Sequence, residues 1–171
     1  MKKIRFLALI ILGISLNSCA IFNPTLNPPL ITKNESIEEY KYIFIPTTSS
    51  LTSEIGSVYN GYGSSISKTV NPKDIISGIL LKKGFIIIPE IKDELKNETI
   101  IINYGESGKR LIPKGLGGYS MEVTVSFISA KNYKKLCSCT AEGIGETESD
   151  DIREAINRCL SGLLTKWNQS K

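Results

Sequence analysis

The sequence predicts an α+β fold, a two-layer sandwich in which a mostly antiparallel sheet carries two helices on one face. Three observations predict it: a capped amphipathic helix after residue 70, a long alternating hairpin over residues 119–144, and a helical pattern at the C-terminus. With 171 residues, 41% hydrophobic and 22% charged, the chain suits one domain with its own core. We expect this single α/β domain over residues 40–167, with elements in the order β-α-β-β-β-β-α.

The first helix has the clearest local signals. Asn71 is a typical N-cap, Pro72 fits the first helical position, and Gly84 follows the expected end. The apolar stripe between them comprises Ile75, Ile76, Ile79 and Leu80. Short strands are expected on either side of this helix, at residues 40–45, 85–88 and 99–104. The Ser-, Gly- and Tyr-rich residues 47–70 and the Gly-rich residues 105–118 are expected to be long loops.

The hairpin is expected to have one buried and one polar face. Its alternating apolar positions include Met121, Val123, Val125 and Phe127. If Ser129 pairs with Tyr133 around the turn, Val123 lies opposite Cys139 and Met121 lies opposite Ala141. The small residues on the second strand then leave room for a helix to approach closely.

The C-terminal helix is expected to bring Cys159 level with Cys139. The strand from Cys139 to Ile144 covers about 16 Å, and the helix from Ser149 to Cys159 returns about 15 Å. In an oxidising compartment the two cysteines form a disulfide that closes a loop of about 20 residues and contributes roughly 3 kcal/mol. The alternative is a pair of reduced thiols packed side by side, and the sequence leaves both open.

Residues 1–18 have the features of an export signal. Three basic residues precede an apolar run over residues 6–16, which is too short for a typical membrane-spanning helix. The segment Leu16-Asn17-Ser18-Cys19 resembles a bacterial lipobox. This resemblance implies that the signal is removed and that Cys19 carries a lipid anchor. Residues 19–39, which contain three prolines, are expected to form a lipidated flexible tether to the domain.

With its lipobox, this layout resembles the small periplasmic lipoproteins of Bacteroidetes and Proteobacteria. It resembles more loosely the lipopolysaccharide-assembly lipoprotein that plugs an outer-membrane barrel. The resemblance implies attachment to the outer membrane, because Ala20 and not Asp follows Cys19. No acidic run follows Cys19, which favours the periplasmic face. The resemblance carries over no catalytic residues.

Composition excludes several classes of function. The chain has no histidine, which removes Ser-His and Cys-His nucleophile pairs and most zinc enzymes. Without the three basic residues of the signal, the 21 basic residues fall to 18 against 17 acidic ones, and the net charge falls from +4 to about +1. That balance gives no support to nucleic-acid binding. Since neither phosphate-binding glycine motif occurs, we expect no cofactor. We also expect no metal, because three cysteines without a histidine make an incomplete site and no EF-hand spacing occurs.

The expected function is a non-enzymatic binding or envelope-assembly module. The residues best suited to contact a ligand, an envelope protein or a glycan lie in the two expected loops: Tyr59, Tyr62, Lys109, Arg110 and Lys114. One alternative is an envelope enzyme that uses carboxylates within residues 142–151, although acidic residues there also suit the start of a helix. Another is a structural protein that binds cell-wall polymer through the basic loop.

Overall fold

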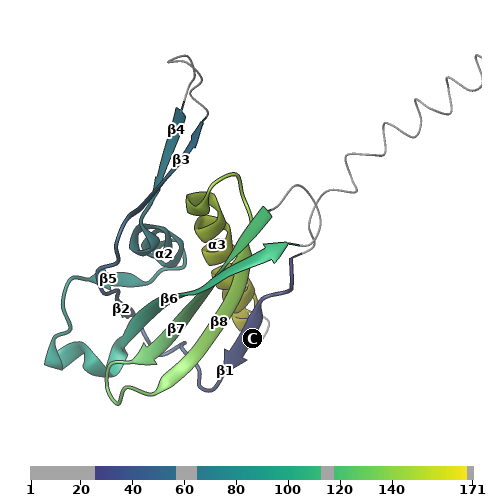
Figure 1. Ribbon diagram of the computed structural model, residues 1–171. Coiled ribbons are helices and arrows are strands. Elements are labelled where there is room, and N and C mark those ends of the chain that lie inside the picture. The colour runs from purple at the N-terminus through teal and green to yellow at the C-terminus, as the bar shows by residue number, and fades with distance from the viewer. Residues whose placement is uncertain (1–25, 57–64, 113–117, 169–171) are drawn as a thin grey trace, which may run out of the picture.

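The computed structural model describes residues 26–56, 65–112 and 118–168 (Figure 1). The expected signal peptide and Cys19 lie outside these residues, as do Tyr59, Tyr62 and Lys114. The main sheet has six strands in the order β1-β8-β7-β6-β2-β5. In chain order these are β1 (Leu30–Lys33), β2 (Tyr42–Phe44), β5 (Ile86–Ile88), β6 (Thr99–Ile112), β7 (Gly118–Ser129) and β8 (Lys135–Gly143). A separate two-stranded sheet pairs β3 (Leu51–Gly56) with β4 (Ser65–Val70).

The predicted α+β sandwich is confirmed. Strands β1, β8, β7 and β6 are antiparallel neighbours, and β2 runs parallel to both β5 and β6. Helices α2 (Pro72–Leu81) and α3 (Glu148–Asn168) pack on the same face of this sheet (Figure 1). A short 3-10 helix, η2 (Asp93–Glu98), which the sequence did not predict, leads into β6.

Helix α2 begins where its local signals predict and ends at Leu81, two residues earlier than the position of Gly84 predicts. The Asn71 side chain accepts a hydrogen bond from the Lys73 amide at 3.0 Å, and Pro72 occupies the first turn. Two residues of the predicted stripe, Ile76 and Leu80, are fully buried. Gly84 has φ +91°, a conformation that favours glycine, in the turn that leads to β5.

Helix α3 lies very close to the end of β8. A Cβ atom on Gly143 would collide with the Asp151 carbonyl oxygen and would lie 2.5 Å from the Ala155 nitrogen. Only glycine at position 143 therefore permits this approach. The contact presses the buried stripe of α3 onto the core face of β7 and β8, where Val123, Val125, Phe127, Cys139 and Ala141 are buried.

The predicted hairpin of β7 and β8 is confirmed, but its expected register is wrong by two residues. Cys139 lies opposite Val125 and not Val123. The turn is longer than expected because the Ser129 amide bonds the Lys134 carbonyl, with Tyr133 at φ +57°. The register of β8 against β7 then shifts by one further residue at Leu136, because Ile128 pairs with Lys135 whereas Phe127 pairs with Cys137. Since a shift of two keeps every side chain on its face, the buried and polar faces are as predicted.

Two segments expected to be loops are instead largely strands. Residues 51–56 and 65–70 form the β3–β4 hairpin, which projects from the body of the domain in Figure 1. Strand β6 continues to Ile112, well past the predicted end at Tyr104, and Lys109 and Arg110 lie on it. Its pairing with β7 shifts between Glu106 and Gly108, where Gly108 has φ +116°.

The N-terminal boundary of the domain also differs from the expectation. Residues 30–33, expected within the flexible tether, form β1 and pair antiparallel with β8, and Ile37 is buried in the core. The structure therefore has three strands before α2 that the predicted order lacks: β1, β3 and β4.

Candidate functional site

The face of the main sheet opposite the helices has an apolar half. Phe44 lies between the buried residues Ile43 and Ile45, so its side chain is on the face that carries no helix. The strand register places on that same face four isoleucines, of which Ile86 is 52% exposed and the others are half-buried. We call these five residues the apolar patch: Phe44, Ile86, Ile88, Ile101 and Ile128.

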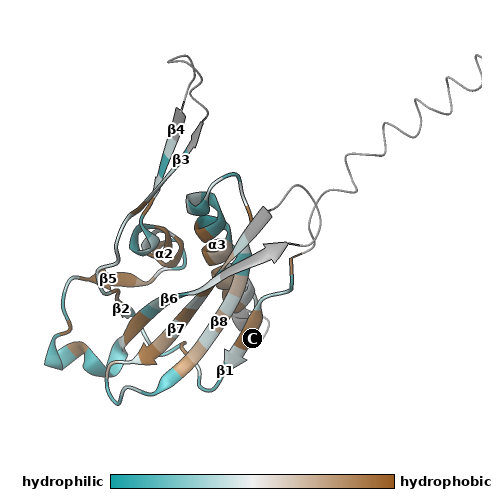
Figure 2. Cartoon of the chain, in the orientation of Figure 1, coloured by the Kyte–Doolittle hydropathy of each residue, from teal (hydrophilic) through white to brown (hydrophobic). Residues whose placement is uncertain are grey.

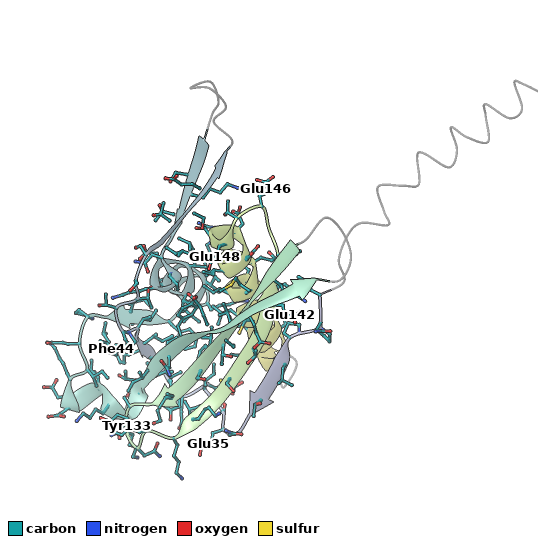
Figure 3. The ribbon with its side chains drawn as sticks, viewed as in Figure 1. Glu35, Phe44, Tyr133, Glu142, Glu146 and Glu148 are labelled. Atoms are coloured by element: carbon teal, nitrogen blue, oxygen red, sulfur yellow. The ribbon has the colours of Figure 1, made fainter. Side chains whose placement is uncertain are left out.

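The register makes the apolar patch continuous across four strands. Phe44 on β2 lies between Ile88 on β5 and Ile101 on β6, and Ile101 pairs with Ile128 on β7. Contiguous exposed apolar surface on a protein marks sites that bind partners or membranes. Figure 3 shows Phe44 on this part of the sheet, and Figure 2 shows β5 as strongly hydrophobic.

Strand β5 also ends the sheet. Within the described residues it pairs only with β2, so its outer edge presents backbone groups to a possible further strand. Natural edge strands are usually protected by short length, charges, prolines or bulges; β5 is short, but its three isoleucines supply no charge and no proline. The edge and the apolar patch together form a surface suited to an extended apolar segment of another protein.

The other half of this face is polar. It carries Ser126 and Thr124 on β7, opposite Ser138 and Thr140 on β8, and the Thr124 and Thr140 hydroxyls lie 2.8 Å apart. Thr32 on the edge strand β1 is exposed on the same face. The sheet face is therefore divided between a polar half and the apolar patch.

The apolar patch is absent from the predicted contact residues, although the sequence contains a signal for it. Residues 85–88 and 100–102 are uninterrupted apolar runs, without the alternation expected of a strand that has one solvated face. Such runs indicate apolar contacts on both faces. The helices supply those contacts on one face only.

The carboxylates proposed for an enzyme are engaged in structural contacts. Asp150 accepts hydrogen bonds from the Lys68 ammonium at 2.8 Å and from the Thr147 hydroxyl at 2.9 Å, and Glu146 also pairs with Lys68. Lys68 holds the pKa of Asp150 below its usual value. The Thr147 hydroxyl in turn accepts from the Asp150 amide at 3.1 Å, as in a helix N-cap. The acidic residues therefore form the start of helix α3, which is the structural interpretation of this segment.

This helix start also holds the base of the β3–β4 hairpin. Ser149 is buried, and its amide donates to the Ser53 hydroxyl at 3.1 Å while its own hydroxyl donates to the Lys68 carbonyl at 2.9 Å. Figure 3 shows Glu146 and Glu148 near this junction and Glu142 apart from them on β8. The carboxylates proposed for an enzyme therefore do not form one group: Glu142 lies on β8, whereas Glu146 lies just before α3 and Glu148 begins it.

Glu142 belongs to a cluster that fixes the N-terminal segment. Its carboxylate accepts hydrogen bonds from the Asn27 amide at 3.3 Å and from the Asn27 side-chain nitrogen at 3.2 Å. The Arg158 guanidinium on α3 donates to the Asn27 carbonyl at 2.7 Å and to the Glu142 carbonyl. We call Asn27, Glu142 and Arg158 the N-terminal clamp.

The predicted meeting of Cys139 and Cys159 occurs, but without a disulfide bond. Both are buried thiols, and the Cys159 thiol donates to the Cys139 carbonyl at 3.1 Å. The hydrogen bond with Cys139 and burial raise the pKa of Cys159, and burial raises the pKa of Cys137 to about 12. The structure therefore corresponds to the reduced alternative, in which the thiols pack as core residues.

The predicted contact residues do not form one described site. Tyr59, Tyr62 and Lys114 lie outside the described residues, and for Lys109 and Arg110 the structure describes the backbone position on β6. Across the described ranges, no group of three or more acidic or cysteine side chains is arranged to hold a metal ion. Nor does any helix in these ranges have the length and apolar character needed to cross a bilayer.

Comparison with known proteins finds no matching family model and no matching curated relative for this sequence.

Proposed function

We propose that this chain is a lipoprotein, anchored at Cys19 to the periplasmic face of the bacterial outer membrane, that binds another envelope protein without catalysing a reaction. The apolar patch beside the open edge of β5 is the observation that carries the binding part of the proposal. The basic, apolar and lipobox-like segments of residues 1–19 support the anchor.

The mode of binding follows from the shape of this surface. An extended segment of the partner adds a strand to the outer edge of β5, and main-chain hydrogen bonds supply affinity. Alternate side chains of that segment then cover Ile86 and Ile88, and the apolar patch provides specificity. A cell-wall polymer, by contrast, has few apolar groups with which to cover this patch.

The enzyme alternative receives less support from the same residues. Asp150 and Glu146 are paired with Lys68, and the Glu142 carboxylate accepts two hydrogen bonds from Asn27. A double replacement, Glu146→Gln with Glu148→Gln, separates the two hypotheses. A binding module keeps partner capture in this variant, whereas a carboxylate enzyme loses its function in the cell.

Site-specific photo-crosslinking in intact cells tests the binding surface. A photo-reactive side chain at position 86 is expected to give a crosslinked product with one envelope protein, and Ile86→Lys is expected to abolish capture of the same protein. Thr32 is the matched control, because it is exposed on the same sheet face at the opposite edge strand. Equal products from positions 86 and 32, or capture unaffected by Ile86→Lys, would contradict the proposal.

The anchor is tested separately. Cys19→Ala is expected to leave an uncleaved precursor that takes up no fatty-acid label during growth. Labelling of the Cys19→Ala protein would refute lipidation at this residue.

A further inference from the structure

The N-terminal clamp shortens the connection between the domain and the membrane. Asn27 is held through its amide, carbonyl and side chain by Glu142 and Arg158. Beyond it, Pro29 and Ile31 lie against α3 at Gly162, where an added Cβ would be 3.1 Å from the Ile31 side chain. The chain is therefore fixed to the domain from Asn27 onward, twelve residues before the expected end of the tether at residue 39.

The length of the remaining connection limits where the domain lies. Eight residue steps separate Cys19 from Asn27, and a fully extended chain covers at most about 29 Å over that length. A lipid anchor at Cys19 therefore keeps the end of the domain that contains Asn27 close to the bilayer.

The register shows which end of the sheet this is. Leu30 pairs with Thr140 and Lys33 with Cys137. The residues that precede Leu30 therefore lie toward Gly143, where β8 ends. Gly143 lies opposite Met121. Beyond the pair of Gly143 and Met121, only β6 and β7 continue. Arg110 on β6 pairs there with Ser120 on β7, and the last pair is Ile112 with Gly118. The β6–β7 hairpin thus overhangs the sheet at the end from which the N-terminal segment leaves (Figure 1).

The overhanging strands have the composition of a membrane-contacting surface. On β6 they carry Arg110, Leu111 and Ile112, directly after Lys109 at the level of Met121, and on β7 they carry Tyr119. No acidic residue occurs in the sequence from Ser107 to Ser120. Basic residues near an anionic leaflet attract its headgroups, and aromatic and apolar side chains suit the interface.

We propose that the overhanging end of the β6–β7 hairpin, with Lys109 and Arg110 on β6, rests on the anionic headgroups of the membrane that holds the lipid anchor. The proposal depends on the lipidation of Cys19 proposed above. It orients the domain, because the turn between β7 and β8, which contains Tyr133, is at the opposite end of the sheet from Glu142 (Figure 3). The apolar patch lies toward that distal end, where a partner in the periplasm reaches it.

Tryptophan quenching by brominated phospholipids tests this orientation. The purified lipoprotein, with its one tryptophan replaced by Trp167→Phe, receives a single reporter by Ile112→Trp and is inserted in vesicles of brominated phosphatidylglycerol and phosphatidylethanolamine. Tyr133→Trp is the matched control, since Tyr133 is 71% exposed at the far end of β7. Leu111→Trp replaces the first reporter if Ile112→Trp alters the circular dichroism spectrum.

We expect strong quenching at position 112 and little at position 133. Each basic residue near an anionic surface favours contact by about fivefold. The double variant Lys109→Gln, Arg110→Gln is therefore expected to reduce quenching at position 112 to the level at position 133, and so are vesicles of neutral, brominated phosphatidylcholine. Equal quenching at the two positions, or quenching unaffected by the double variant or by neutral lipid, overturns the proposal and leaves the anchor intact. Failure of the protein to float with vesicles overturns the anchor and this inference together.

Discussion

The close approach of α3 to Gly143 makes a sharp prediction about stability. In Gly143→Ala the new Cβ collides with the Asp151 carbonyl and lies 2.5 Å from the Ala155 nitrogen, whereas ordinary contacts begin at about 3.4 Å. Both opposing groups are helix backbone, so no side chain rotation relieves the contact. The start of α3 must therefore retreat by about 1 Å or more from β8.

The cost of that retreat follows from what α3 buries. Fully buried α3 residues near this contact include Ile152, Ala155 and Ile156. A gap of 0.5–1 Å already forfeits about a quarter to a half of the dispersion energy of each contact. We expect Gly143→Ala to lower the free energy of unfolding by about 1–3 kcal/mol and the thermal midpoint by about 2–12 °C.

Urea unfolding followed by circular dichroism measures this, with Gly78→Ala as the matched control. Gly78 lies inside α2, and a Cβ there has no neighbour within 4 Å. Because alanine is a better helix former, Gly78→Ala is expected to raise the free energy of unfolding by about 1 kcal/mol. If Gly143→Ala costs less than about 1 kcal/mol, below the range for overpacking, the packing of α3 on β8 is not as described.

Three further predictions concern the stability of the fold and the reactivity of its buried thiols. Leu80→Ala removes a fully buried side chain of α2 and is expected to cost about 2–5 kcal/mol; an unchanged midpoint would place this helix face wrongly. Because Lys68 lowers the pKa of Asp150, their pairing stabilises the fold above the unfolded pKa and this contribution is lost as the pH falls below about 4. Asp150→Asn is thus expected to be less stable than the native chain at pH 7 and to converge with it as the pH falls through the lowered pKa of Asp150, and a constant difference would argue against the pair. Cys139 and Cys159 are expected to resist alkylation until the protein unfolds, and mass spectrometry of unreduced peptides from exported protein shows whether oxidation has joined them.

Features that depend on neighbouring residues could be predicted from the sequence. The cap at Asn71 and the proline at the first turn place the start of α2 correctly, and Gly84 places its end within two residues of Leu81. Alternation of apolar and polar residues correctly assigns the two faces of β7. The sheet-and-helix layout follows from these local patterns.

Features that depend on distant residues could not be predicted in this way. Strand β1 is four residues long, and its pairing partner in β8 is more than 100 positions away, so no local pattern marks it. The register of β7 and β8 depends on the left-handed conformation of Tyr133 and on one extra residue at Leu136, neither of which has a sequence signal. The β3–β4 strands consist largely of Ser and Thr, whose composition equally suits a loop.

The pairing of β1 with β8 also determines the order in which the domain assembles. Asn27 and Glu142 are 115 residues apart in the chain, and Arg158 lies further on in the last helix. During synthesis the N-terminal segment emerges first, yet its strand and its clamp have no partners until nearly the whole chain has followed. Long-range pairing of this kind closes late because its loop entropy is lost before any contact is gained. We therefore expect β1 to join the sheet late, after β8 and α3 have formed.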